Sequence, residues 1–155
     1  MKKIVYIILA LALLLSLCAC GEKTEQEALP VALGYVYEGF SDALPEMIAV
    51  EGDMRLNMLG IAEEDCAQVH TYICGEGLRA DEVWLIEAVD SAALERVEAL
   101  AQSRKTAKME ETSFYSPDQY AVCEDGRIIS EGLYLAFIVS PEADTLEKTF
   151  LEAVK

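Results

Sequence analysis

The chain has 155 residues and a formal net charge of −16, from 28 acidic and 12 basic side chains. A chain of this length accommodates one globular domain. The negative field excludes generic binding to nucleic acid, because phosphates would be repelled by it. Hydrophobic residues make up 53% of the chain, which is too much for a disordered acidic tail. The sequence therefore predicts one folded acidic domain and no nucleic-acid partner.

The N-terminal residues have the pattern of an export signal. Lys2 and Lys3 precede an apolar run, residues 4–17, that is short for a membrane span of roughly 20 residues. The run ends in Leu17-Cys18-Ala19-Cys20-Gly21, which resembles the lipobox of bacterial lipoproteins. The resemblance implies that residues 1–19 are a signal peptide and that the thiol of Cys20 receives a diacylglyceryl group. The alternative is an ordinary secretory signal in which both cysteines are incidental.

Lipidation of Cys20 predicts the location of the protein. Two acyl chains anchor a protein stably where one would bind reversibly. Residues 20–30 then form a polar, Glu-containing tether, and residues 31–155 form a single domain. We expect the domain on the extracytoplasmic face of the cell membrane, held there by its lipid anchor.

Three cysteines remain in the domain, Cys66, Cys74 and Cys123. Their number is odd, and the sequence has neither a CxxC pair nor the ligand spacing of a zinc site. We expect three free thiols, with a disulfide through Cys123 as the alternative. The sequence predicts no metal site and no cofactor.

The first half of the domain is predicted to contain helices and then two strands. Residues 31–40 and 42–50 favour one or two short helices, interrupted by glycine and proline. Residues 67–74 alternate in polarity, which is typical of a half-buried strand, and residues 82–89 are apolar on both faces. Asp90 or Ser91 then begins a long helix that runs to about residue 111.

The second half repeats this order. Ser116-Pro117-Asp118-Gln119 is a capping box with proline at the first helical position, and it predicts a two-turn helix. Residues 127–130 and 133–139 then indicate a hairpin, and a last helix follows from about residue 142. The predicted fold class is α+β: a four-stranded antiparallel sheet of two hairpins, with helices packed mainly on one face.

Arg104 is the most informative residue of the long helix. It lies within the predicted apolar stripe formed by Ala93, Val97, Leu100 and Ala107. A cation in that position must extend to water, pair with an internal carboxylate, or bind an anionic ligand. We expect a structural ion pair, and Arg104 is the candidate ligand or ion-pair residue.

Catalytic candidates are weak. His70 with Cys66 or Cys74 could form a nucleophile and base, but four residues of strand separate the side chains by about 13 Å. Asp81 and Glu82 are strand neighbours that point to opposite faces. The acidic residues 63–65 lack the alternating pattern of a calcium loop. We predict no catalytic residue and no enzymatic activity.

Three tyrosines have two alternative roles in the predicted fold: they either line a groove or pack at strand edges. These tyrosines are Tyr115, Tyr120 and Tyr134.

Several short motifs, in this order, make the chain similar to a known family. They are Leu59-Gly60-Ile61, Ala80-Asp81-Glu82-Val83, Arg104 in the long helix, Phe114-Tyr115-Ser116-Pro117, and Gly132-Leu133-Tyr134. Together they resemble the domain of unknown function 4358, found in Gram-positive lipoproteins, over roughly residues 43–154. The family has no assigned activity, so the resemblance implies fold and location and no particular chemistry.

These patterns lead to one functional expectation and two alternatives. We expect a membrane-anchored, extracytoplasmic lipoprotein that acts as a non-catalytic binding module, with an envelope protein or polymer as its possible partner. The first alternative is an accessory factor for modification or export of cell-envelope polymers. The second is a small hydrolase.

Overall fold

The computed structural model describes residues 30–155, so the predicted signal peptide and Cys20 lie outside the described residues. Five strands form one antiparallel sheet in the order β1-β2-β3-β5-β4. The elements in chain order are α2 (Leu33–Glu38), β1 (Met47–Ala49), α3 (Gly52–Leu59), β2 (Cys66–Cys74), β3 (Glu82–Ala88), α4 (Ser91–Ser113), α5 (Pro117–Glu124), β4 (Arg127–Glu131), β5 (Tyr134–Val139) and α6 (Ala143–Val154). None of the helices in residues 30–155 combines the length and apolarity that a membrane span requires.

The two central strands, β3 and β5, carry apolar side chains on both faces. Val83 and Leu85 of β3 point to one face, and Trp84 and Ile86 point to the other. All four are fully buried. A strand whose side chains are apolar on both faces of the sheet must be covered on both sides.

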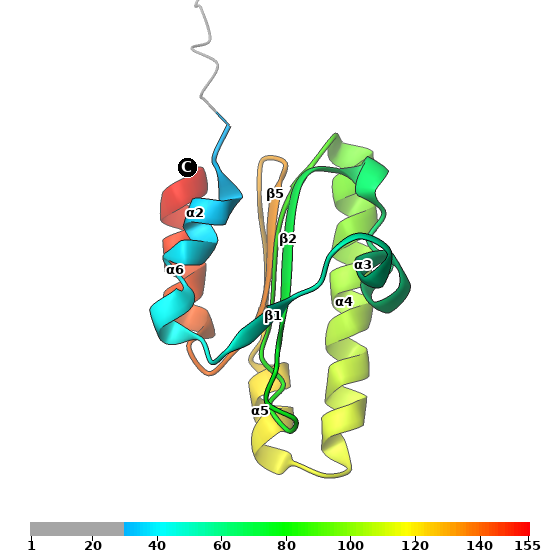
Figure 1. Cartoon of the computed structure of the whole chain (residues 1–155), viewed down its shortest axis with the longest axis vertical. Helices are drawn as coiled ribbons and strands as arrows, with labels where there is room; N and C mark the ends of the chain where they lie inside the picture. Colours follow the sequence, from blue (N-terminus) through cyan, green and yellow to red (C-terminus); the bar gives the residue numbers. More distant parts are fainter. Residues whose placement is uncertain (1–29) are drawn as a thin grey trace, which may run out of the picture. The chain divides into compact units, whose positions relative to one another are not determined.

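Helices therefore pack on both faces of the sheet, and the prediction that they lie mainly on one face is wrong. Helices α2 and α6 cover one face, and α4 with α3 covers the other (Figure 1). We call these the α2/α6 face and the α4 face. The double covering follows from the apolar runs of β3 and β5, each of which supplies both cores.

The sheet has five strands where the sequence predicted four. The additional strand is β1, inside the segment 42–50 that was predicted to be helical. Pro45 disfavours helix at the residue before it, and Leu44 is extended, with φ −109° and ψ 153°. Met47 and Ala49 then pair with Cys74 and Tyr72 of β2. The predicted α+β class and its two hairpins, β2–β3 and β4–β5, are confirmed.

Helix α4 carries the polar site described below, and its ends were well predicted. The Asp90 side chain accepts a hydrogen bond from the Ala93 backbone N–H at 2.7 Å, which caps the N-terminus. The predicted stripe needs one correction, because Ala107 is exposed and Ala101 is buried in its place. The inward face thus passes through Ala101 and then through Arg104 and Lys108.

Candidate functional site

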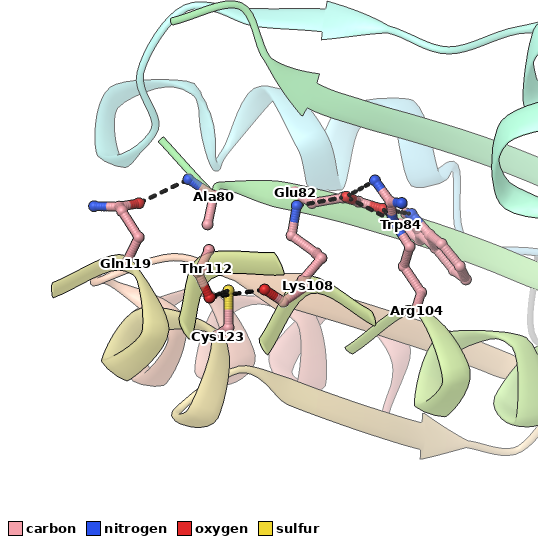
Figure 2. Close-up of polar contacts among 8 residues, drawn as sticks. All are labelled: Ala80, Glu82, Trp84, Arg104, Lys108, Thr112, Gln119 and Cys123. Carbon is pink, nitrogen blue, oxygen red and sulfur yellow. Dashed lines mark hydrogen bonds and ion pairs between the residues drawn. The ribbon is translucent and has the colours of Figure 1, made fainter. Parts of the chain in front are cut away.

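Glu82 is the centre of a buried polar cluster on the α4 face. As the first residue of β3 it is fully buried, yet it carries a carboxylate. Arg104 donates to this carboxylate from Nε at 2.9 Å and from Nη2 at 2.8 Å. Lys108 Nζ donates at 2.9 Å, and the indole N–H of Trp84 donates at 2.9 Å (Figure 2). Four donors from three side chains therefore satisfy one carboxylate.

The strand and helix periods explain this convergence. Glu82 and Trp84 are two residues apart on β3, so both side chains point toward α4. Arg104 and Lys108 are four residues apart on α4 and lie one turn from each other on its inner face. Figure 2 shows both cations reaching from the helix to Glu82. The cluster is a buried ion pair in which two cations share one acid.

The ionised form of Glu82 is stabilised by its partners. Burial alone would raise the pKa of this carboxyl, but the hydrogen bond from Arg104 and the charges of Lys108 and Arg104 outweigh burial and lower it. Burial acts against the charge of Arg104, but its hydrogen bond to Glu82 and the charge of that carboxylate raise its pKa above the ordinary value. Both groups are therefore charged in the folded protein at neutral pH.

A cleft of about 180 Å³ opens beside this cluster. Arg104 and Lys108 line it together with a second ion pair, in which Arg79 Nε donates to Asp81 at 3.0 Å. Glu111 and Tyr115, which are both exposed, also line it. The cleft is thus charged inside and aromatic at one edge.

Helix α5 is fixed against the same end of the sheet. The backbone N–H of Ala80 donates to Gln119 Oε1 at 2.7 Å, and Thr112 Oγ1 contacts Cys123 Sγ at 3.9 Å (Figure 2). Half of the predicted capping box forms at the N-terminus of α5, because Ser116 Oγ accepts from the Gln119 N–H. The reciprocal contact is absent among the described residues, since Gln119 Oε1 is engaged by Ala80 and the Ser116 N–H donates to the Thr112 carbonyl. These contacts hold the turn between α4 and α5 beside the cleft.

Exposed apolar side chains surround this end of the domain. Phe114 is 90% exposed, Leu78 is 73% exposed and Tyr115 is 51% exposed. A second hollow, lined by Ser113, Pro117 and Tyr120, lies on the same turn. We call this region, defined by Leu78, Phe114, Tyr115 and Tyr120, the aromatic end.

The other candidates do not converge. A register shift between Cys66 and Gln68 turns Cys66 into the core of the α4 face. His70 lies on the opposite face, with its ring against Gly34 of α2. Cys66 and His70 therefore lie on opposite faces of the sheet and do not form a nucleophile and base pair. Burial also raises the pKa of Cys66 to about 11, so its thiol is protonated at neutral pH.

The remaining predicted features have structural roles or lie elsewhere. Cys66, Cys74 and Cys123 are free thiols in residues 30–155. Asp65, of the acidic segment 63–65, pairs with Arg96 of α4. In that same range, no group of three or more His, Cys, Asp or Glu side chains has the arrangement of a metal site.

Two predicted tyrosines lie at different places, and two residues of the polar cluster were not predicted. Tyr115 lines the cleft, whereas Tyr134 hydrogen bonds to the backbone of Val31 at another place. Lys108 was missed, although its position four residues after Arg104 on the same helix face was a readable signal. Glu82 was recognised only as a neighbour of Asp81, although an acid at the head of a buried strand requires a cationic partner.

These features define an α+β domain with a charged cleft at one end of its sheet. A family model described as Domain of unknown function (DUF4358) matches residues 41–140. The match covers more than half of the chain, and the chain belongs to this family. The matched residues include Glu82, Arg104 and Lys108. No curated protein and no solved structure matches the chain.

Proposed function

We propose that the protein is a lipid-anchored, extracytoplasmic binding module that engages its partner through the aromatic end. The lipobox-like residues 17–21 support the anchor, and Cys20 is the residue that would carry the lipid. The binding surface is supported mainly by one observation: the cleft lies at the end of the sheet away from the point at which the tether would enter the domain.

The domain begins at the end of the sheet away from the cleft. The Val31 N–H donates to the Tyr134 hydroxyl at 3.1 Å, and the Val31 carbonyl accepts from Gln68 Nε2 at 2.8 Å. Gln68 is near the start of β2, whereas Cys74, at its end, lines the cleft. Six residues of strand correspond to about 20 Å. An anchor attached before Val31 would leave the aromatic end accessible to partners.

Several observations favour binding over catalysis. The thiol of Cys66 is protonated and lies across the sheet from His70. The carboxylate of Glu82 is engaged by four donors and fully buried, so it is poorly placed to transfer protons to a substrate. Large exposed aromatic residues, by contrast, are typical of interaction surfaces.

Site-specific crosslinking in intact cells tests the binding surface. A photo-crosslinking amino acid replaces either Phe114, at the aromatic end, or Tyr35, which is 75% exposed on α2. We expect adducts from position 114 and none from position 35, because only the first lies at the proposed binding end. Equal adducts from both positions, or none from position 114, would contradict the proposal.

The anchor is tested separately. Cys20→Ala should abolish incorporation of a labelled fatty acid, while Cys18→Ala, two residues away, should leave it unchanged. A Cys20→Ala protein that still carries the label would show that the lipobox assignment is wrong.

A further inference from the structure

In the ion pairs of the cleft, the acidic side chains are more deeply buried than the basic ones. The side chains of Asp81 and Glu82 are 1% and 0% exposed, whereas those of Arg79, Arg104 and Lys108 are 39%, 27% and 11% exposed. Each acid therefore lies beneath its cations. A molecule that enters the cleft meets the positive ends of these pairs first.

Two of these cations retain donors for a ligand. Among the described residues, Arg104 uses Nε and Nη2 on Glu82, and its Nη1 has no hydrogen-bond partner. Lys108 Nζ donates only to Glu82, although an ammonium has three N–H groups. Glu82 holds both side chains in fixed positions, which reduces the entropy that a ligand would have to remove on binding.

The charges of the cleft favour a ligand with no more than one negative charge. Arg104 and Lys108 share one carboxylate, so these three side chains together carry one net positive charge, which Glu111 in the same lining offsets. Glu111 lines the same cleft and is exposed, so it would repel a second negative charge. A carboxylate fits this balance better than a phosphate dianion.

The size of the cleft and the exposed Tyr115 favour a ligand that contains one small saturated ring. Its volume of about 180 Å³ is below the roughly 300 to 1,000 Å³ of pockets for drug-sized ligands. Tyr115 is half exposed at the edge, and the negative face of an aromatic ring favours the C–H groups of a saturated ring. The polar interior suits a hydroxyl-rich ring better than a hydrocarbon.

We propose that this cleft binds an acidic sugar unit, with its single carboxylate on Arg104 Nη1 and Lys108 Nζ and its ring against Tyr115. The proposal rests on the binding function proposed above and specifies its ligand class. A sugar of this kind is either free or a unit of a longer polymer, and the monosaccharide is sufficient to test the cleft itself.

Trp84 provides the readout. It is the only tryptophan of the chain, and its indole N–H donates to Glu82. The full-length protein in nonionic detergent micelles is titrated with sodium glucuronate while the fluorescence and the indole ¹H–¹⁵N signal of Trp84 are recorded. Glucose tests the ring without the carboxylate, sodium acetate tests the carboxylate without the ring, and glucose 6-phosphate tests a dianion.

We expect a saturable change with glucuronate, and much weaker changes with the three comparison compounds at equal ionic strength. Equal responses to glucose and glucuronate would overturn the carboxylate contact, and equal responses to acetate would overturn the ring contact. Tighter binding of glucose 6-phosphate would overturn the preference for one charge. No response to glucuronate up to its solubility limit would overturn the proposal as a whole.

Substitution of exposed residues completes the test without threatening the fold. Glu111→Gln removes the repulsive wall and should tighten glucuronate binding about threefold to tenfold. Glu110→Gln, its exposed neighbour outside the cleft lining, makes the same charge change and should have a much smaller effect. Tyr115→Ala should weaken binding at least several-fold. Equal effects of the two glutamate variants, or no effect of Tyr115→Ala, would overturn the assigned site.

The outcome is separable from that of the crosslinking experiment. Crosslinks from position 114 together with no glucuronate binding would leave the binding module in place and reject the acidic sugar. Glucuronate binding without such crosslinks would support the cleft ligand and reject the proposed partner surface.

Discussion

The two faces of the sheet are closed by different physical means. The α2/α6 face is sealed by apolar packing, with Phe40, Leu146 and Phe150 against Val83 and Leu85. The α4 face has an equally apolar centre around Trp84 and Ile86, but its end contains a buried carboxylate and two cations. Both faces are built from the same strand, since alternate residues of β3 point to opposite sides.

This difference separates a face that only stabilises the fold, the α2/α6 face, from one that also holds charged groups, the α4 face. Apolar packing stabilises a fold without pointing polar groups in a particular direction. A buried ion pair is weak evidence for stability, because replacement by apolar groups is often neutral or favourable. The Glu82 cluster lies beside the cleft. Its proposed role is therefore to orient the donor groups of Arg104 and Lys108 toward the cleft.

The largest effect is expected when Glu82 alone is removed. Glu82→Ala leaves Arg104 and Lys108 without their shared acid and Trp84 without its acceptor. We expect a loss of about 3 to 5 kcal/mol in the free energy of unfolding, measured by chemical denaturation.

A combined variant sharpens this result. Glu82→Gln with Arg104→Met and Lys108→Met keeps an acceptor for Trp84 and makes the rest of the cluster apolar. This triple variant should recover most of the lost stability while losing glucuronate binding. If the triple variant were as unstable as Glu82→Ala, the ion pair would be a net source of stability, and the comparison between the faces would fail.

Removal of Arg104 alone should have a smaller effect. Arg104→Met leaves Lys108 on Glu82, so we expect a loss of about 1 to 3 kcal/mol in the free energy of unfolding. Arg96→Met, on the same helix, removes an exposed cation paired with Asp65 and should cause little change. Equal melting of the wild type and Arg104→Met would contradict a structural contribution from this pair.

The sequence predicted one residue of this site, Arg104, on the helix side. Its position in an apolar stripe indicated an internal carboxylate, an anionic ligand or a route to water, and spacing alone could not name Glu82, since this partner lies 22 residues away on another element. The exposed Ala107 was placed in the stripe because alanine fits either environment. Burial of Ala101 became evident only with the packing of α4 on the sheet.

The fold was predicted where local signals were strong. The Ser116 cap, the Asp90 cap and both hairpins depend on neighbouring residues, and the sequence contains those residues. Strand β1 is only three residues long and depends on pairing with β2, so local propensity did not reveal it. The second helical layer follows from the apolar runs of β3 and β5, which require cover on both faces of the sheet.

Acidification should weaken the end of the α4 face that holds Glu82. The pKa of Glu82 lies below its ordinary value of 4.5, because the donated hydrogen bonds and charges outweigh the opposing effect of burial. The ionised cluster therefore contributes fully above the unfolded-state pKa and is lost as the pH falls through the folded-state pKa. The stability difference between the wild type and Glu82→Gln should be constant near neutral pH and shrink below about pH 4.5. A difference that grew on acidification would contradict this sign.

The smallest expected effect comes from trimming one methylene group in each apolar core. Ile138→Val on the α2/α6 face and Ile86→Val on the α4 face both alter fully buried side chains of the central strands. Each should reduce the free energy of unfolding by about 0.5 to 1.5 kcal/mol, because each removes similar packing. Both reductions should be the same at neutral pH and at about pH 4, since neither isoleucine contacts the Glu82 carboxylate. A pH-dependent cost for Ile86→Val alone would mean that the charged cluster is coupled to the whole α4 core. The contrast would then lie between two complete faces of the sheet, and the polar site could not be treated as confined to the end that carries the cleft.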